Sequence, residues 1–405
     1  MNEQLIVKNF GPIKDATVDF KRVTVFIGPT GGGKSTLAKL VLLFNNEIDN
    51  SQIIKEEVRK GLFKQYGLNK FFTKKTYINS NIGVNYKKST INSSQDESSA
   101  NFSNLSDSAE NYSIQLIRNE VISLRKQISS TANAPSKSFS NDKEWLLNAL
   151  NKRLSDAQMR LLDAQESLIK YLQKTSISSK AKYIPAERIF VSSISYAWSG
   201  FMRDDIGLPK VILDFANRFS VARRDIFQLA IPFLNIRYTH KNDEDYITTP
   251  QSKALFRLAE TASGIQSVVP LLVLLEHLTY NTEQAQSFII EEPELNLYPT
   301  AQQGLLNWLV EKCTKGENDL TITTHSPYLL AHFNTLLFAY QVAQNHPERA
   351  DEIAKIVPRE SWLDPKEFAA YHVEGQKENG VRSIINPETG LISYNGLDAI
   401  ASAEA

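Results

Sequence analysis

The eight residues from Gly28 to Ser35, Gly-Pro-Thr-Gly-Gly-Gly-Lys-Ser, have the types and spacing of a phosphate-binding loop. Glycines let the backbone curl so that successive N–H groups point at one anion, and a following helix adds the positive end of its dipole. Lys34 is expected to reach the β- and γ-phosphates of a nucleoside triphosphate, and the Ser35 hydroxyl to bind Mg²⁺. The expected nucleotide contacts are Gly28, Pro29, Thr30, Gly31, Gly32, Gly33, Lys34, Ser35 and Thr36.

A second group of candidate residues is acidic and follows the short apolar run 287–290. A buried strand with this exit delivers its carboxylates to the edge of a parallel sheet, where ligands bind. Glu291 is expected to hold Mg²⁺ through water. Glu292 is the candidate for orienting and polarising an attacking water, because phosphoryl transfer depends on an in-line nucleophile. An apolar strand followed by surface acids is also common, and this motif alone leaves that reading open.

His325 belongs to the sequence Thr-Thr-His-Ser-Pro, which directly follows residues 320–322, a segment with apolar residues at both ends. A histidine at the end of a strand can donate a hydrogen bond to a γ-phosphate and thereby report its presence. Single histidines more often fill surface or core positions. This assignment therefore depends on the position of His325 after the two preceding motifs.

Residues 261–267, Thr-Ala-Ser-Gly-Ile-Gln-Ser, open an apolar segment that is expected to be helical. Ser263 or Ser267 is a candidate N-cap, and Gly264 permits close backbone approach, so this segment is a second candidate anion site. Pro270 is unfavourable inside a helix, which predicts that the helix either kinks or begins late.

Alternating strand and helix patterns are expected to position these motifs. Short strands are predicted at 5–10, 16–20 and 23–27, with a Gly-Pro break between the first two. Apolar spacing predicts a helix over 36–44, directly after the loop, and a further strand over 182–186. The strand, loop and helix order is the one that a phosphate-binding loop requires.

Residues 45–180 differ in composition from the rest of the chain and include a Ser/Asn-rich segment, 79–113, predicted to be a mobile loop. Apolar residues then follow at spacings of three and four, at Ile114, Ile117, Val121, Leu124 and Ile128. A second such series comprises Leu147, Leu150, Leu154, Ala157, Leu161, Ala164 and Leu168. With a Ser/Asn/Pro-rich turn at 133–141, they predict an antiparallel coiled-coil hairpin. Two ordinary core helices are the alternative.

Composition narrows the class of protein. The 405 residues are 42% hydrophobic, enough for a large core, and 45 Lys and Arg balance 45 Asp and Glu. This balance is not that of a dedicated nucleic-acid binder, although it leaves a local basic patch possible. The single cysteine, Cys313, and a start without a signal-peptide pattern predict the cytoplasm. The most apolar run, 268–275, is too short to span a membrane.

Taken in order, the phosphate loop, Ala-Ser-Gly-Ile-Gln-Ser, Ile-Ile-Glu-Glu-Pro-Glu-Leu-Asn-Leu-Tyr-Pro and Thr-His-Ser-Pro-Tyr-Leu-Leu resemble the ABC-type ATPase heads of the RecF, SMC and OLD group. Within that group the set is most similar to bacterial stand-alone AAA-family ATPases, such as those of the Septu, PARIS and retron-linked anti-phage systems. The resemblance implies an α/β fold: an ABC-type P-loop head with a mostly parallel sheet, antiparallel N-terminal strands and the inserted helical hairpin. It divides the chain into 1–44 and 181–340 as the head, 45–180 as the insertion and 341–405 as a helix and hairpin tail.

The same resemblance implies an ATPase that uses ATP with Mg²⁺, with Lys34, Glu292 and His325 as catalytic residues. It further implies a homodimer or higher homo-oligomer in which Ser263 and Gly264 act in trans on the γ-phosphate of a neighbour. A separate effector protein, a nuclease or toxin of an anti-phage system, is the implied partner. Family members also have contacts soon after the insertion, which would correspond to Arg188.

Two other functions stay open. One is a DNA-repair ATPase of the RecF or SMC type, and the other is a nucleotide-binding scaffold with negligible turnover. The chain lacks the acidic pairs of a Toprim nuclease after His325, and Gly264 is followed by Ile-Gln where a transporter ATPase has Gly-Gln. In the tail, residues 386–390 are predicted to form a hairpin turn. The hairpin would either cap the edge of a sheet or bind a partner.

Overall fold

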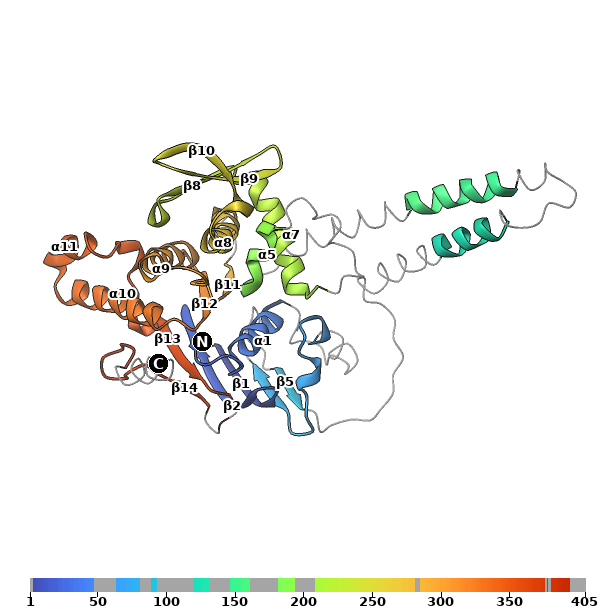
Figure 1. The fold of residues 1–405 in the computed structure, drawn as a ribbon. Helices are drawn as coiled ribbons and strands as arrows, with labels where there is room; N and C mark the ends of the chain where they lie inside the picture. The colour runs from blue at the N-terminus through green and yellow to red at the C-terminus, as the bar shows by residue number, and fades with distance from the viewer. Residues whose placement is uncertain are drawn as a thin grey trace, which may run out of the picture. The chain divides into compact units, whose positions relative to one another are not determined.

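The computed structural model describes residues 3–46, 63–80, 89–92, 120–131, 146–160, 181–193, 208–280, 285–375, 377 and 380–393 (Figure 1). The chain divides into two compact units. Met1–Gln95 and Ser179–Ala405 form the first, called the head below, and Asp96–Ser178 form the second, called the insertion unit.

A six-stranded sheet forms the centre of the head, in the order β14-β13-β3-β12-β11-β6. Five strands are parallel and β14 is antiparallel to β13. The strands are β3 (Val23–Ile27), β6 (Ala181–Ile184), β11 (Ser287–Glu291), β12 (Asp319–Thr324), β13 (Phe368–Val373) and β14 (Val381–Ser383). Strands β3, β6, β11 and β13 are buried along their whole length, as expected for short apolar runs covered on both faces.

Alternate residues of the central strands enter two hydrophobic clusters. On β11, Phe288 and Ile290 pack with residues of α7 (Lys210–Asp225), α8 (Ser263–Tyr280), α9 (Pro299–Cys313) and α10 (Pro327–Asn345). Ile289 belongs instead to the cluster formed with α1 (Lys34–Asn46) and the N-terminal strands. This period of two is the direct consequence of the strand geometry.

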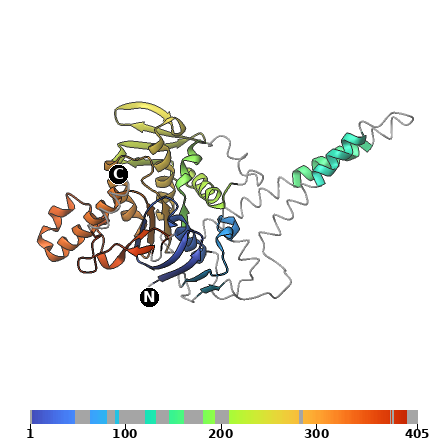
Figure 2. The same cartoon turned by 60° about the horizontal axis from the view of Figure 1, so that its bottom comes forward.

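Two antiparallel sheets complete the head. The N-terminal sheet has the order β2-β1-β4-β5, with β1 (Glu3–Phe10), β2 (Ile13–Phe20), β4 (Tyr77–Ser80) and β5 (Ser89–Asn92). The other sheet lies between α7 and α8 in the sequence, in the order β10-β9-β8-β7. Its strands are β7 (Gln228–Ile231), β8 (Ile236–Lys241), β9 (Glu244–Thr249) and β10 (Ser252–Arg257). The two sheets lie at opposite sides of the head in both views (Figures 1 and 2).

Shorter elements connect these layers. The remaining helices are α5 (Ile189–Ser193) and α11 (Ala350–Ala354), and the 3-10 turns are η1 (Asn69–Phe71), η2 (Ala186–Arg188), η4 (Pro232–Leu234), η5 (Leu258–Glu260), η6 (Pro347–Arg349), η7 (Arg359–Ser361) and η8 (Pro365–Glu367). None of the helices in the described ranges is both long and apolar enough to cross a membrane.

The mixed α/β fold with a mostly parallel sheet and antiparallel N-terminal strands is as predicted. The predicted boundary of the insertion at residue 45 is wrong, because β4 pairs with β1 and residues up to Gln95 belong to the head. The predicted loop over 79–113 therefore begins inside a strand at Asn79, and β5 also lies within its range. The segment is too polar for a strand pattern to be recognised in it, so its pairing with β1 was not predicted.

The predicted tail also contributes to the core of the head. Strand β13, from the predicted tail 341–405, pairs with β3 in parallel and so becomes part of the central sheet. The predicted turn at 386–390 is confirmed: Gly390 donates to the Asn386 carbonyl, and Asn386 donates to that of Leu391. Ile385 and Ile392 pair across it as a bridge.

The insertion unit contains two described helices, residues 120–131 and 146–160. Val121 and Leu124 of the first helix are buried in one cluster with Leu150 and Ala157 of the second. Arg160, at the end of the second helix, forms an ion pair of 3.0 Å with Glu120 at the start of the first, so the two helices run antiparallel. The predicted turn at 133–141 and the outer residues of both series lie outside the described residues.

Candidate nucleotide site

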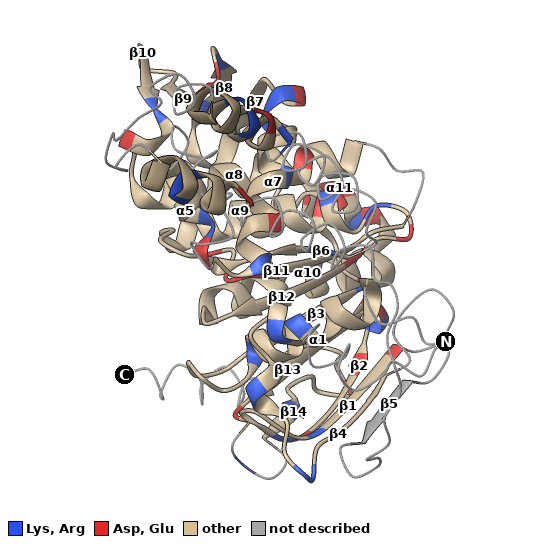
Figure 3. Ribbon diagram, turned by 90° about the vertical axis from the view of Figure 1, so that its right-hand side faces the viewer, with Lys and Arg blue, Asp and Glu red and all other residues tan. Residues whose placement is uncertain are grey.

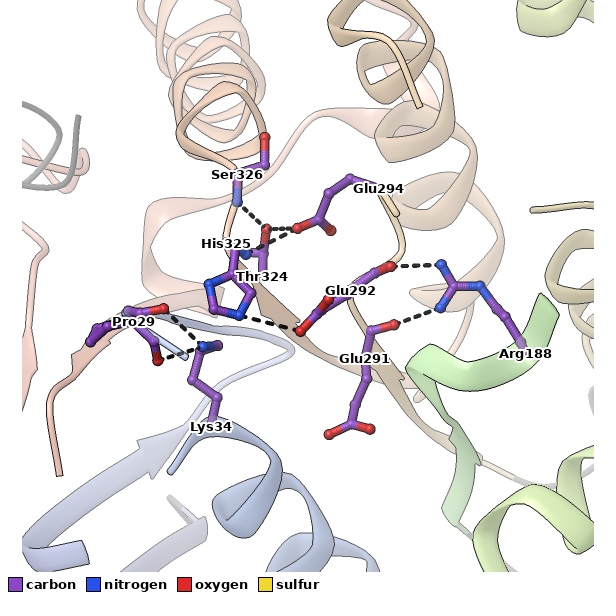
Figure 4. Close-up of polar contacts among 10 residues, drawn as sticks. Pro29, Lys34, Arg188, Glu291, Glu292, Glu294, Thr324, His325 and Ser326 are labelled. Atoms are coloured by element: carbon purple, nitrogen blue, oxygen red, sulfur yellow. Dashed lines mark hydrogen bonds and ion pairs between the residues drawn. The ribbon is translucent and has the colours of Figure 1, made fainter. Parts of the chain in front are cut away.

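The phosphate loop occupies the turn between β3 and α1, as its motif requires. Strand β3 ends at Ile27 and α1 begins at Lys34. Three loop glycines have positive φ angles, 151° at Gly28, 78° at Gly31 and 108° at Gly33, which residues with a Cβ rarely adopt. The Lys34 Nζ donates to the carbonyl oxygens of Gly28 at 2.8 Å and Pro29 at 3.1 Å (Figure 4). The lysine therefore lies over the curled backbone that is expected to hold phosphate.

The end of β13 supports this loop from behind. A Cβ on Gly28 or Gly32 would overlap the carbonyl oxygen of Val373. Beyond the strand, the Gly375 N–H donates to the Gly32 carbonyl at 2.9 Å, and the Gly375 carbonyl accepts from Lys14 at 2.7 Å. The glycines thus serve close packing on a strand far along the chain as well as backbone curvature. No motif in the sequence predicts this support, and its one local signal is a glycine two residues after the mostly apolar residues 368–373.

A cavity of about 490 Å³ opens over the loop, within the size range of small-molecule sites. It brings together eight residues predicted from three separate motifs, namely Thr30, Gly31, Gly33, Lys34, Ser35, Thr36, Glu292 and His325. Pro12 and Phe71 complete the lining. Phe71 was not predicted, since no spacing relates it to the motifs; it packs edge-on against Phe10 of β1.

Glu292 and His325 lie opposite each other in this cavity. The His325 Nε2 is 3.3 Å from the Glu292 Oε1, and both side chains are about one-third exposed (Figure 4). Glu292 follows β11 in a left-handed conformation, with φ of 42°, and its N–H donates to the Thr323 carbonyl at 2.8 Å. Because β11 and β12 are adjacent parallel strands, their carboxyl ends deliver the two side chains to the same edge of the sheet.

Glu291 lies deeper than Glu292 and is only 5% exposed. Burial raises the pKa of its carboxyl, while the nearby Ser35 and Tyr183 hydroxyls act in the opposite direction. Its Oε1 is buried without a hydrogen-bond partner among the described residues. A carboxylate oxygen in need of a partner beside a serine hydroxyl is the kind of oxygen-donor set that Mg²⁺ prefers. Ser35 and Glu291 therefore fit the metal role predicted for them, although within the described ranges no three His, Cys, Asp or Glu side chains cluster as a metal site.

A buried chain of hydrogen bonds fixes the backbone around His325. Glu294 Oε1 accepts from the Thr324 Oγ1 at 2.5 Å and from the His325 N–H at 3.0 Å. The Ser326 N–H donates to the Thr324 Oγ1 at 2.9 Å, and the Ser326 Oγ donates to the Gln302 Oε1 at 2.6 Å. These bonds join the segment after β11, the residues 324–326 at the end of β12 and helix α9, and His325 lies at the surface of this network.

Ser263 and Gly264 lie outside the cavity lining. Ser263 is exposed at the first residue of α8, while Gly264 is buried against the Asn296 carbonyl, which a Cβ would overlap. Neither predicted N-cap is correct. The Ala262 carbonyl accepts the first helical bonds, from Ile265 and Gln266, and Ser267 lies buried inside the helix. The close approach predicted for Gly264 is to the segment after β11.

Pro270 lies within α8, which begins at Ser263 and not later. A proline at this position cannot donate to the Gln266 carbonyl, four residues earlier. The Ser192 Oγ donates to that carbonyl instead, at 2.8 Å. The helix therefore continues because a side chain of α5 replaces the missing donor.

Sequence comparison places the chain among known proteins. Two overlapping segments, residues 1–189 and 62–330, match the sequence model of the AAA ATPase domain. The chain belongs to the AAA ATPase domain family. No curated protein matches it.

Solved structures similar to this ATPase-family chain include the SMC head domain from Thermotoga maritima, at 12% identity and a TM-score of 0.36, covering 82% of this chain and 91% of that one. Another is the recombination mediator protein RecF, at 11% identity and a TM-score of 0.32, covering 95% and 98%. Both scores are low, and the family assignment rests on the sequence match alone.

Proposed function

We propose that the head binds ATP in the cavity over the phosphate loop and hydrolyses it. The observation that carries this proposal is the meeting of Glu292 and His325 in the cavity that the loop lines. A loop by itself indicates only that a nucleoside triphosphate binds. A carboxylate and a histidine facing each other beside it supply a proton acceptor and a donor at the position of the terminal phosphate.

Each side chain has a distinct role in this reaction. Lys34 leaves the carbonyls of Gly28 and Pro29 to bind the β- and γ-phosphates. Glu292 orients a water and accepts its proton while the water oxygen forms a bond to the γ-phosphorus. The bond from that phosphorus to the bridging oxygen breaks, and ADP leaves with the electron pair. The His325 N–H donates to a γ-phosphate oxygen. Phe71 lines the same cavity and would offer an aromatic side chain to the nucleotide.

Ser35 and Glu291 would hold the Mg²⁺ that accompanies ATP, and the ion would neutralise charge on the phosphates. The buried Glu291 Oε1, which has no hydrogen-bond partner in the described part of the chain, supports this role.

A second copy of the chain completes the site in this proposal. The exposed Ser263 at the start of α8 lies away from the cavity of its own head. The N-terminus of an 18-residue helix favours an anion. Contact with the γ-phosphate on a neighbouring head would give this helix end a ligand and would make dimerisation depend on ATP. Hydrolysis would then release the two heads.

Phosphate release by purified protein tests the hydrolytic proposal. Wild type with Mg²⁺ is expected to release phosphate, and Glu292→Gln to be at least about a hundredfold slower while still binding ATP. Lys34→Ala is expected to lose ATP binding itself, which separates the two roles. Equal background rates in wild type and Glu292→Gln would overturn the enzyme and favour a nucleotide-binding scaffold.

What the pairing and release of the heads acts on is a separate proposal, and it rests on the resemblance of the motif set. We propose that the heads hold or release an effector protein, a nuclease or toxin, in anti-phage defence. The DNA-repair alternative predicts hydrolysis that duplex DNA stimulates with steep salt dependence. Figure 3 shows Lys and Arg interspersed with Asp and Glu along the described ribbon, and the full chain has 45 residues of each sign. A balanced charge gives no general electrostatic attraction to DNA, and for this reason we favour a protein partner.

A further inference from the structure

Arg188 is the largest fully buried side chain among the described residues and lies ten positions after Ser178, the end of the insertion unit. It ends η2, which follows the edge strand β6. Strand β6 pairs in parallel with β11, so its continuation runs beside the exit that carries Glu291 and Glu292. A charged side chain in such a place is costly unless its donors are satisfied.

The guanidinium satisfies its donors entirely with backbone carbonyls. Nη1 donates to the Glu291 carbonyl at 2.8 Å and Nη2 to the Glu292 carbonyl at 2.6 Å (Figure 4). Nη1 also donates to the Pro185 carbonyl at 3.2 Å, and Nη2 to the Pro293 carbonyl at 3.1 Å. Nε donates to the Ser267 carbonyl of α8 at 3.1 Å. One side chain therefore joins three consecutive carbonyls, beginning at the last residue of β11, to the helix that begins at Ser263. A direct nucleotide contact by Arg188, as the resemblance implied, does not fit this burial.

The carbonyl of Glu292 is the critical acceptor in this set. Glu292 has a φ of 42°, a left-handed conformation that is unfavourable for a residue with a Cβ. The same carbonyl accepts from the Leu295 N–H at 3.1 Å. With Arg188 and Leu295 both donating to it, the peptide after Glu292 is fixed, and this fixes the direction in which the carboxylate leaves the backbone toward His325.

The other end of the contact lies on a helix that is already irregular. Pro270 leaves the Gln266 carbonyl without its helical donor, and the Ser192 Oγ supplies one at 2.8 Å. Arg188 bonds the next carbonyl, that of Ser267. Ser192 and Arg188 are four residues apart on the segment from η2 into α5, so this segment holds α8 through two neighbouring carbonyls.

We propose that Arg188 is a positioning residue that holds Glu292 in its hydrolytic orientation and ties that orientation to helix α8. The inference rests on the proposed hydrolysis of ATP. Movement of α8, when Ser263 meets or leaves a γ-phosphate, reaches the peptide of Glu292 through one guanidinium. The site on one head thereby responds to the contact that its own α8 makes with the other head.

Arginine is the side chain that this role requires. Its five N–H donors lie in a rigid plane, so it can bond carbonyls on two elements at fixed angles, whereas lysine offers a single rotating ammonium. Burial lowers the pKa of Arg188 to about 10, and the neighbouring glutamates oppose the fall, so the guanidinium stays charged at neutral pH.

Arg188→Lys tests the proposal in the full-length protein. The dissociation constant of a fluorescent ATP analogue is expected to change less than about threefold, because Lys34 and the loop are untouched. The kcat for phosphate release is expected to fall about tenfold to a hundredfold, the range for losing hydrogen bonds from a charged group. Amide hydrogen exchange should rise in peptides spanning 288–297 and stay unchanged in those of α1.

Arg218→Lys is the matched control, since Arg218 of α7 is likewise a buried arginine and lies near Lys182 of β6 and Asp214. It is expected to leave kcat within about twofold of wild type.

Equal loss of kcat in both variants would show that any buried arginine has this effect and would overturn the proposal. A rise in the ATP dissociation constant in parallel with the loss of kcat would show general loosening of the head and would also overturn it. Wild-type kcat in Arg188→Lys would do the same. Insoluble protein from both Arg188→Lys and Arg188→Gln would assign Arg188 to folding instead. Absence of hydrolysis by wild type would defeat the proposed function, a result distinct from all of these.

Discussion

Glu294 illustrates how single residues around the site are placed by their buried surroundings. Its carboxyl is 8% exposed, accepts from Thr324 and the His325 N–H through Oε1, and has a buried Oε2 without a partner among the described residues. Burial raises the pKa of this carboxyl above 4.5, while the hydrogen bonds act in the opposite direction. The Glu294 carboxyl therefore fixes the backbone of His325, and the free energy of burying this carboxyl is less favourable when it is ionised.

The pH dependence of stability should reveal this cost. A raised pKa in the folded state means that the folded protein binds the proton more tightly, so the contribution of Glu294 to stability is greatest below pH 4.5 and is lost as pH rises through the raised pKa. Glu294→Gln keeps the acceptor oxygen and cannot ionise. Relative to wild type, the variant should gain unfolding free energy as pH increases from about 4.5 to 8. Urea unfolding at a series of pH values measures the difference, and a constant difference would contradict the assignment.

The elements that form the site come from distant parts of the sequence. The phosphate loop follows β3, but β13, more than 300 residues later, supports it through Val373 and Gly375. A Cβ on Gly375 would overlap the carbonyl oxygens of Pro12 and Gly32. The shape of the loop therefore depends on a turn that contributes nothing to its motif.

Gly375→Ala should weaken ATP binding without altering any residue of the cavity. Overpacking of this kind costs about 1–3 kcal/mol. If that cost falls on the loop, the ATP dissociation constant rises about fivefold to a hundredfold. Gly316→Ala is the control, because its Cβ would meet nothing within 4 Å and only the φ of 61° adds strain. Titration with a fluorescent ATP analogue compares the two, and equal affinities would refute the support by β13.

The sequence predicted those elements whose pattern is local. Strands at 5–10, 16–20 and 23–27 and the helix after the loop lie close to the observed β1, β2, β3 and α1, because alternation, a Gly-Pro break and apolar spacing act over a few residues. The pairings of β4 with β1 and of β13 with β3 join distant segments, and no local pattern specifies such partners. Likewise, Glu292 and His325 could be predicted because they belong to local motifs. The position of Phe71 in the cavity and the carbonyl contacts of Arg188 depend on how distant segments pack in the folded chain.

At the scale of the whole molecule, the head has two features proposed to bind anions, and they do not line one common cavity. The cavity over the phosphate loop contains Lys34, Glu292 and His325, and the exposed Ser263 lies elsewhere at the start of α8. In a two-fold symmetric pair that brings Ser263 of one head to the cavity of the other, the second Ser263 meets the first cavity as well, because such an interface uses the same surface on both copies. Each ATP would then be bound between two chains.

Mixing two inactive variants distinguishes this arrangement from a site within one chain. Lys34→Ala removes the phosphate contact, and Ser263→Arg places a bulky side chain at the helix end that should face the partner. Each variant alone should have both sites of its dimer defective. In a mixed dimer both defects fall in one site, while the intact loop of one chain meets the intact Ser263 of the other. Phosphate release should therefore recover partially on mixing, to about a quarter of the wild-type rate if chains pair at random and sites act independently. If Ser263 served the loop of its own chain, every site would carry a defect and mixing would restore nothing.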